Sequence, residues 1–202
     1  MARLVLASAS PRRRELMNLW GVTYRIAPAD LDEDRATAEL GSFDPSAIAQ
    51  HLARAKALAV SAEDDEYVIG VDTLVALGDQ ILGKPVDEAD AFAMLHAEQG
   101  NAQTVHSGLA VVHRGEVVGD GVEQTIVRMR PVPDEVIWQY IRTEKPFDKA
   151  GAYAIQEGAG SFIEGYEGCY NNIVGLPLCL LSAIIKRNYL PLVIPPSLPP
   201  RC

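Results

Sequence analysis

An apolar, β-branched run at residues 66–77, EYVIGVDTLVAL, restricts the possible folds more than any other segment. Runs of this kind are typical of strands that are buried within a sheet. A Gly78-Asp79 pair follows directly and has the chemistry of a two-residue hairpin turn. We therefore predict a buried strand that is followed at once by an antiparallel partner.

The predicted hairpin also gives a register between its strands. Counting back from the turn places Leu77 opposite Gln80 and, further along, Thr73 opposite Lys84. Lys84 would then be a cross-strand or diagonal neighbour of Asp72, with their Cβ atoms roughly 5–8 Å apart. The hairpin is thus expected to bring a lysine next to the carboxylate that interrupts the apolar run.

Asp72 is an anomaly in this strand, because burying an unpaired carboxylate costs several kcal/mol. One interpretation is a strand-end aspartate that accepts hydrogen bonds from backbone amides. The other is a Mg²⁺ ligand or general base, with Lys84 holding the phosphate oxygens that the metal also touches. The strand pattern alone leaves both open.

Strand and helix patterns alternate along the rest of the chain. Helices are predicted at residues 11–20, from Asp44-Pro45 to about 62, at 87–99, at 133–143 and around 176–187. Strands are predicted at 3–7 and within 104–130, with a hairpin around Arg114-Gly115 and turn signals at Gly119 to Gly121. The acidic segment DLDEDR at 30–35 is predicted to be a loop, EGAGSFIEGYEG to form two short strands or loops, and the proline-rich end to form no regular element. No internal repeat or linker is visible, so we expect one α/β domain.

Three arginines stand at the start of the first predicted helix. Ser10 is a plausible N-cap and Pro11 the first helical residue, which places Arg12, Arg13 and Arg14 in the first turn. Free amides and the helix dipole favour anions there, so each cation is unfavourable by about 0.3–1 kcal/mol. Something negative should compensate this charge.

Two partners for the arginines are possible. Acidic side chains from elsewhere could pair with them, since the chain has 27 Asp and Glu residues. Alternatively, a bound phosphate would be held by the helix-end amides, the Ser8 and Ser10 hydroxyls and bidentate arginine. A carboxylate, a lysine and an arginine-bearing helix end are together the groups that phosphate-ester hydrolysis requires.

A third polar segment is FDKAGAYAIQEGAG, in which glycines permit close backbone approach. Its Gln156 could recognise a base edge, because an amide presents a donor and an acceptor side by side. A solvent-facing glutamine is the simpler alternative. Serine-hydrolase, zinc-protease and P-loop spacings are not found in the sequence.

Composition limits the partners and the compartment. The net charge of −9 provides no overall attraction to nucleic acid or to an anionic membrane, so we expect neither as a partner. The apolar runs are shorter than the roughly 20 residues of a membrane span. Three cysteines without Cys-x-x-Cys spacing argue against a disulfide framework and a zinc site, which favours a reducing, cytoplasmic location.

Four segments in this order resemble the Maf family of nucleoside triphosphate pyrophosphatases, historically linked to septum formation. They are LASASPRRREL, GVDTLVALGDQILGKP, VHSGLAVV and FDKAGAYAIQEGAGSFI…GCYNNIVGLPL, and the likeness runs from about residue 3 to 186. The resemblance implies an elongated α/β fold with a mixed sheet flanked by helices and two lobes around a central cleft. It also implies one catalytic domain at 1–188, a proline-rich tail at 189–202 and a homodimer.

The implied reaction is hydrolysis of a nucleoside triphosphate to monophosphate and pyrophosphate with a divalent cation, Mg²⁺ or Mn²⁺. Position by position, the resemblance assigns catalysis to Asp72, Lys84, Arg13 and Glu33, with Asp72 as proton acceptor and metal ligand. It assigns substrate binding to Ser8, Arg12, Arg13, Lys56, Thr73, Lys84 and Gln156, and substrate choice to Arg12, Thr73 and Gln156.

The segment KAGAYAIQ resembles the branch of the family that prefers dTTP and UTP, possibly including modified pyrimidine nucleotides. A 7-methyl-GTP pyrophosphatase is the alternative within the family. Outside enzyme function, the alternatives are a nucleotide-binding regulator of cell division without turnover, or an interaction module whose arginines bind an acidic partner.

Overall fold

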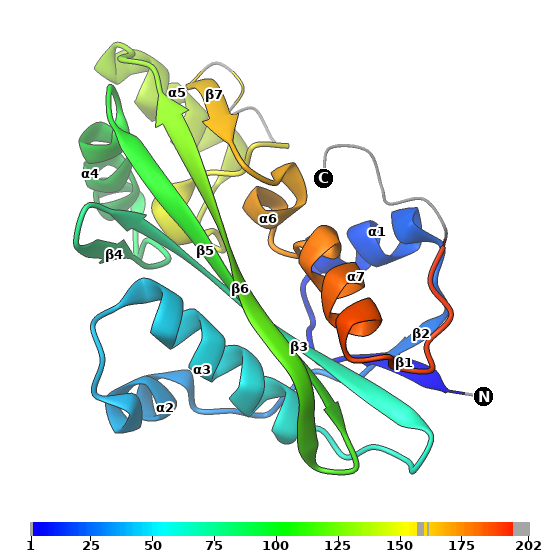
Figure 1. The fold of residues 1–202 in the computed structure, drawn as a ribbon. Coiled ribbons are helices and arrows are strands. Elements are labelled where there is room, and N and C mark those ends of the chain that lie inside the picture. Colours follow the sequence, from blue (N-terminus) through cyan, green and yellow to red (C-terminus); the bar gives the residue numbers. More distant parts are fainter. Residues whose placement is uncertain (1, 157–159, 161, 196–202) are drawn as a thin grey trace. The chain divides into compact units, whose positions relative to one another are not determined.

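The computed structural model of the chain describes residues 2–156, 160 and 162–195. Its strands form a seven-stranded mixed sheet in the order β2-β1-β3-β5-β6-β7, with β4 paired to β3 (Figure 1). The strands are β1 Arg3–Leu6, β2 Tyr24–Ile26, β3 Glu66–Leu77, β4 Gln80–Leu82, β5 Ala102–His113, β6 Glu116–Met129 and β7 Ile163–Glu167. The helices are α1 Pro11–Trp20, α2 Glu33–Leu40, α3 Pro45–Leu58, α4 Glu88–Glu98, α5 Asp134–Glu144, α6 Tyr170–Val174 and α7 Leu178–Arg187, with a 3₁₀ turn η1 at Ala150–Ala152. The predicted mixed sheet flanked by helices is confirmed.

The chain divides into two compact units, and β3, β5 and β6 contribute residues to both. The first unit contains the described residues up to Thr73, together with Ser107–Glu123 and the described residues from Cys169 onward. The second unit contains Leu74–His106 and the described residues between Gln124 and Gly168.

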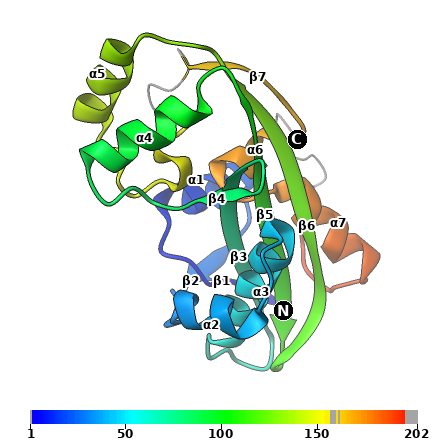
Figure 2. The same cartoon turned by 90° about the vertical axis from the view of Figure 1, so that its left-hand side faces the viewer.

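Two glycines bring α3 very close to the sheet of the first unit. An ideal Cβ at Gly70 on β3 would lie 2.0 Å from the Ala53 carbonyl oxygen, and one at Gly108 on β5 would lie 2.1 Å from that of Ala49. Real Cβ atoms cannot approach this closely, so only glycine permits this packing distance. Figure 1 shows α3 on one side of these strands and α7 on the other, while Figure 2 shows α2 beside α3.

Gly119 and Gly121 lie inside strand β6 and do not form the turn that the sequence predicts. Turn signals were expected at Gly119 to Gly121, yet β6 continues through them without interruption. A Cβ at Gly119 would lie 2.7 Å from Cγ2 of Ile184, and one at Gly121 would lie 3.0 Å from Cδ1 of Leu180. These glycines therefore let α7 pack on the strand instead of turning the chain.

The second unit is built around hairpin and helix pairs. In the β3–β4 hairpin Leu77 pairs with Gln80, as predicted, but the pairing ends at Val75 with Leu82. The expected pair of Thr73 with Lys84 is therefore wrong. Strand β7 pairs antiparallel with β6, and α4 packs on α5 with the Phe92 and Trp138 rings stacked 4.6 Å apart.

Local signals placed most helices correctly. In α1, Ser10 caps the helix by accepting a hydrogen bond from the Arg13 amide, and Gly21 ends it in the left-handed conformation. Asp44 caps α3, which ends at Leu58 rather than near residue 62. The predicted acidic loop at 30–35 is wrong, because the Asp32 carboxylate caps α2 and this helix begins at Glu33.

Other expectations have mixed outcomes. The hairpin around Arg114-Gly115 is confirmed, with positive φ at both residues. The described part of the proline-rich tail, residues 189–195, has no regular element, whereas 196–202 lie outside the described residues. In the glycine-rich segment EGAGSFIEGYEG the structure has one strand, β7, and residues 157–159 and 161 lie outside the described residues.

Cys179 is disulfide-bonded, which the cysteine spacing did not predict. Among the described residues, no helix has the length and apolar character to cross a membrane.

A buried carboxylate joins the amino ends of the three parallel strands of the first unit. Glu66 at the start of β3 is 1% exposed and accepts two hydrogen bonds of 2.7 Å from Arg25 on β2. It also accepts one of 2.9 Å from the Glu63 amide and lies 3.7 Å from the Arg3 guanidinium on β1. The Arg25 hydrogen bonds, followed by the Glu63 amide, lower the pKa of Glu66 from 4.5 to about 2.

This shift predicts a pH dependence of stability. Because the folded-state pKa is depressed, the contribution is fully present above about pH 4.5 and is lost as the pH falls toward 2. We expect Glu66→Gln to lower the free energy of unfolding by about 2 kcal/mol at pH 7, and this deficit to shrink below pH 4.5. Urea unfolding at several pH values measures both effects. Glu39→Gln, which removes a surface ion pair with Arg35, is the control and should cost less than about 0.5 kcal/mol. A pH-independent deficit for Glu66→Gln would contradict the prediction.

Candidate active site

The candidate site lies where the parallel strands of the first unit end. The pairing of β1 with β3 stops at Leu6 with Ile69, after which the β1 chain leaves the sheet toward α1. Strand β3 continues, so its Asp72 and Thr73 lie beyond the last paired residue of β1. Ligands of open α/β sheets bind at the carboxyl ends of parallel strands, where a strand neighbour leaves the sheet.

Arg13 is held by three neutral oxygens at this strand end. Its Nε donates to the Gly175 carbonyl at 2.8 Å, its Nη1 to the Ser8 hydroxyl at 3.1 Å and its Nη2 to the Thr73 hydroxyl at 3.3 Å. Ser8 also accepts a hydrogen bond from the Ser10 amide at 3.2 Å. The predicted association of Ser8, Arg13 and Thr73 is therefore observed.

The charge of Arg13 is not neutralised by a directly bonded carboxylate. Among the residues that the structure describes, it forms no ion pair, so acidic pairing does not account for this arginine. Burial lowers the pKa of its guanidinium, while the negative charges of Asp72 and Glu33 raise it and the neighbouring Arg12 lowers it. An arginine has five N–H donors, and three are used here, so donors remain for an anion.

A lysine joins two carboxylates on the side of β3 that faces α3. Lys56 Nζ lies 2.6 Å from Asp72 Oδ1 and 3.0 Å from Glu33 Oε1. The Asp72 side chain is 7% exposed and that of Lys56 12% exposed, so this pair is largely removed from water. Asp72 is thus paired with Lys56 of α3, and neither backbone amides nor Lys84 supplies the partner that the sequence suggested.

The second Asp72 oxygen has no partner. Oδ2 is buried and accepts no hydrogen bond from any described residue. A buried carboxylate oxygen in this state is costly, so a ligand, a cation or a water molecule is expected to satisfy it.

These residues fit a divalent cation of the Mg²⁺ type. Asp72 Oδ2 and the half-exposed Glu33 carboxylate are hard oxygen donors, and together with Lys56 they leave one net negative charge. No group of three or more potential ligands occurs in the described part of the chain. Mg²⁺ is commonly bound by one or two carboxylates together with substrate phosphates.

The acidic and basic groups contact opposite faces of β3 near the point where its pairing with β1 ends. Neighbouring residues of a strand point to opposite faces, so Asp72 faces α3 while Thr73 faces Arg13. The two groups nevertheless interact electrostatically, because Asp72 and Glu33 both raise the pKa of Arg13. The strand end therefore has carboxylate oxygens on one face and guanidinium N–H groups on the other.

Two predicted site residues belong to the second unit. Lys84 follows β4 and Gln156 lies in a turn after η1, and both side chains are exposed. Their participation in the site stays a prediction. Conversely, Ser107 and Gly175 contact predicted site residues but were not proposed from the sequence; their only signal was that both fall within segments that resemble the family.

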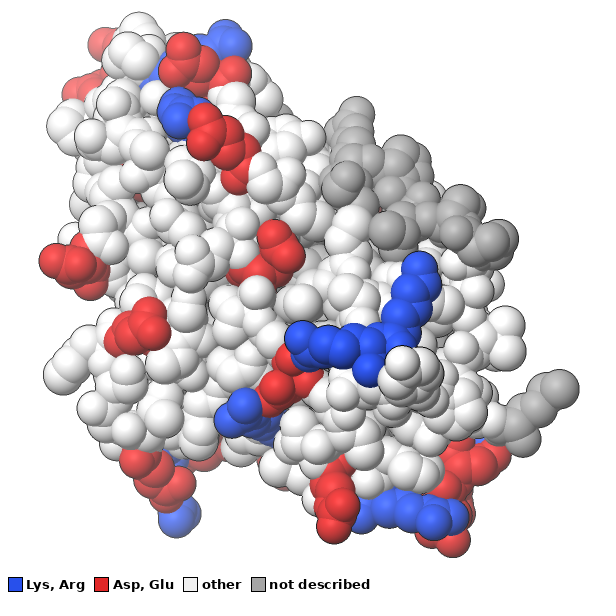
Figure 3. Space-filling view, viewed as in Figure 1, with Lys and Arg blue, Asp and Glu red and all other residues white. Residues whose placement is uncertain are grey.

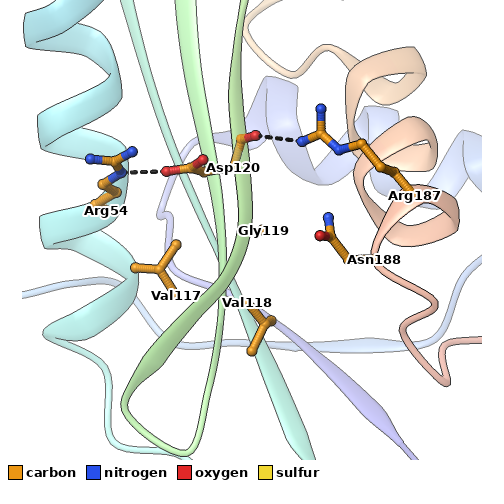
Figure 4. A pocket seen from close by; sticks show the side chains of 7 residues that line it. All are labelled: Arg54, Val117, Val118, Gly119, Asp120, Arg187 and Asn188. Carbon is orange, nitrogen blue, oxygen red and sulfur yellow. Dashed lines mark hydrogen bonds and ion pairs between the residues drawn. The ribbon is translucent and has the colours of Figure 1, made fainter.

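A pocket of the first unit contains no predicted site residue. It is lined by Arg54, Val117, Val118, Gly119, Asp120, Arg187 and Asn188 (Figure 4). The Asp120 carboxylate pairs with Arg54, and its carbonyl accepts a 3.0 Å hydrogen bond from Arg187. In the space-filling view, basic side chains over α7 lie against acidic ones (Figure 3). The Asp120 carboxylate is thus paired within the pocket.

The comparisons with known proteins agree on one family. A family model described as Maf-like protein matches residues 3–188. The chain is 42% identical over 189 residues to a dTTP/UTP pyrophosphatase of Pelotomaculum thermopropionicum, covering 93% of this chain and 97% of the relative. A protein of the same name from Geobacter sulfurreducens is 43% identical over 190 residues, covering 92% and 96%. A third, from Thermococcus kodakarensis, is 44% identical over 188 residues, covering 92% and 97%.

The pairing of Lys56 with Asp72 predicts a specific double-mutant result. Lys56→Met removes the cation and leaves a buried carboxylate, so we expect a loss of about 3 kcal/mol in the free energy of unfolding at pH 7. Adding Asp72→Asn should restore most of this loss, since the buried charge is then gone. Lys186→Met, on the last turn of α7, is the control and should cost less than about 0.5 kcal/mol. A double variant no more stable than Lys56→Met would refute the pairing as the source of the loss.

Proposed function

The chain belongs to the Maf-like family, and from this premise we propose that it is an enzyme that hydrolyses dTTP and UTP to the nucleoside monophosphate and pyrophosphate. Relatives that carry the name dTTP/UTP pyrophosphatase support the two substrates. The structural observation that carries the proposal is the set of hydrogen bonds made by Arg13. Its guanidinium donates to Ser8, Thr73 and Gly175 and retains N–H donors for an anion.

The triphosphate is proposed to bind on the Arg13 side of β3. Arg13 would contact phosphate oxygens through its remaining N–H groups, and Arg12 would add a second positive charge from the same helical turn. The amides at the start of α1 favour the same anion. Because neutral oxygens hold Arg13 in place, little side-chain entropy would be lost when phosphate binds.

Asp72 and Glu33 are proposed to hold a divalent cation, Mg²⁺ or Mn²⁺. Such an ion would neutralise part of the phosphate charge and polarise the anhydride bond when bound. The support is the unsatisfied Asp72 Oδ2 and the single net negative charge of the group. Lys56 fixes the orientation of the Asp72 carboxylate through Oδ1, which keeps Oδ2 directed at the same place.

Asp72 is further proposed to act as the general base. Oδ1 is occupied by Lys56, so Oδ2, which has two lone pairs, would use one toward the cation and the other to accept the proton of the attacking water. The Arg12 and Arg13 charges would stabilise the negative charge that develops on the phosphate oxygens. Lys84 is proposed to assist them, and Gln156 and Thr73 to select the nucleoside; a homodimer and a cytoplasmic location also stay predictions.

A nucleotide panel tests the function. With Mg²⁺ or Mn²⁺, we expect pyrophosphate release to be fastest with dTTP and UTP and slow with CTP, dATP, dGTP and 7-methyl-GTP. Chelation with EDTA should abolish the activity in each case. A clear preference for 7-methyl-GTP would overturn the substrate assignment. Nucleotide-dependent thermal stabilisation without any pyrophosphate release would instead indicate a regulator without turnover.

A variant of the base tests the mechanism. Asp72→Asn keeps the shape of the side chain but removes the proton acceptor, so we expect kcat to fall by a factor of about 10²–10⁴ with a native circular-dichroism spectrum. Asp120→Asn is the matched control, because Asp120 lies in the same unit and also pairs with a basic residue. It should keep the activity. An Asp72→Asn enzyme with most of its turnover would show that Asp72 is not the base.

A further inference from the structure

The Thr73 hydroxyl lies within hydrogen-bonding distance of three groups of the first unit. Arg13 Nη2 is 3.3 Å away, Ser107 Oγ 2.8 Å away and the Gly175 carbonyl oxygen 3.4 Å away. Arg13 can only donate and the carbonyl can only accept, whereas the two hydroxyls can each do either. The direction of the bond between Thr73 and Ser107 therefore decides what Thr73 offers to a ligand.

The burial of Ser107 fixes this direction. Ser107 on β5 is 0% exposed, and its hydroxyl has no other hydrogen-bond partner among the described residues. If Thr73 donated to it, the Ser107 O–H would be buried without an acceptor, which is unfavourable. Ser107 is therefore the donor, and Thr73 Oγ1 is the acceptor.

Toward a ligand, the Thr73 hydroxyl can then act only as a hydrogen-bond donor. A hydroxyl oxygen accepts at most two hydrogen bonds, and those from Ser107 and Arg13 occupy both positions. The Thr73 O–H is directed at the Gly175 carbonyl, which already receives the shorter 2.8 Å bond from Arg13. This 3.4 Å contact is the weakest of the group, so a better-placed oxygen can take the hydrogen from it.

We propose that Ser107 is a positioning residue that makes Thr73 a hydrogen-bond donor toward an acceptor oxygen of the substrate. The proposal rests on the proposed function, because it requires a nucleoside triphosphate at the Arg13 side of β3. Two substrate groups have this chemistry: a phosphate oxygen and the 4-carbonyl of uracil or thymine. Cytosine carries an amino group in place of that carbonyl, so a donor-only Thr73 would disfavour it.

A double-mutant cycle tests the positioning role. Ser107→Ala lets the Thr73 hydroxyl rotate, so we expect kcat/KM for UTP to fall roughly 5- to 10-fold, mainly through KM. Thr73→Val removes the hydroxyl while retaining the side-chain shape. In that background, Ser107→Ala should change kcat/KM by less than about 2-fold, because Ser107 then has no hydroxyl to orient.

Two further measurements identify the substrate oxygen. If Thr73 donates to the base, Ser107→Ala should reduce the preference for UTP over CTP and leave inhibition by inorganic triphosphate unchanged. If Thr73 donates to a phosphate, the inhibition constant of inorganic triphosphate should rise by the same factor as KM, with the UTP-to-CTP preference unchanged. Either pattern supports the role of Ser107 and distinguishes the two sources of the oxygen.

The control is Ser182→Ala, which removes another buried serine hydroxyl, on α7, and should leave kcat/KM unchanged. The inference is overturned if Ser107→Ala leaves kcat/KM unchanged, or lowers it by equal factors in the wild-type and Thr73→Val backgrounds. A wild-type protein that releases pyrophosphate from no nucleotide would instead refute the proposed function. In that case the same cycle, measured on UTP dissociation constants, still decides the role of Ser107.

Discussion

The local structure depends on keeping one charged carboxylate inside a sheet. There Lys56 reaches Asp72 at 2.6 Å and pairs with it. Lys56 is positioned by α3, and α3 can approach because Gly70 and Gly108 have no side chains. The absence of a Cβ atom at Gly70 thus permits the Lys56–Asp72 ion pair two residues further along β3.

Opposite charges are used differently at the two ends of the parallel strands. At the amino ends, Arg25 and Glu66 satisfy each other through two short hydrogen bonds, which contributes to stability. At the carboxyl ends, Arg13 is bonded to neutral oxygens, and one oxygen of Asp72 accepts no hydrogen bond from the residues that the structure describes. Proteins normally satisfy such groups internally, so their incomplete pairing at this edge supports the ligand site that we propose.

The sequence was informative where neighbours along the chain decide the structure. The Ser10 cap, the Gly21 stop and the Arg114-Gly115 turn follow from local chemistry and were predicted correctly. The start of α2 was missed because the acidic composition obscured a second cap. Gly119 misled because a glycine that ends a strand and a glycine that admits a helix look alike in sequence.

The candidate site shows the same limit. Asp72 was recognised as anomalous from its surroundings, but its partner was assigned to Lys84 because hairpin register is readable and helix-to-sheet packing is not. The contacts of Thr73 with Ser107 and Gly175 span 34 and 102 positions, beyond any local pattern. The family resemblance predicts Lys56 as a site residue, but only the fold shows that it pairs with Asp72 and Glu33.

The distance along the chain between Arg13 and Gly175 has a consequence for biosynthesis. The shortest hydrogen bond of this arginine goes to a carbonyl 162 positions later. On a ribosome, β1 and α1 emerge before α6, so Arg13 cannot make this contact until the residues around Gly175 have left the exit tunnel. A chain that ends before Gly175 would therefore lack the shortest hydrogen bond of Arg13.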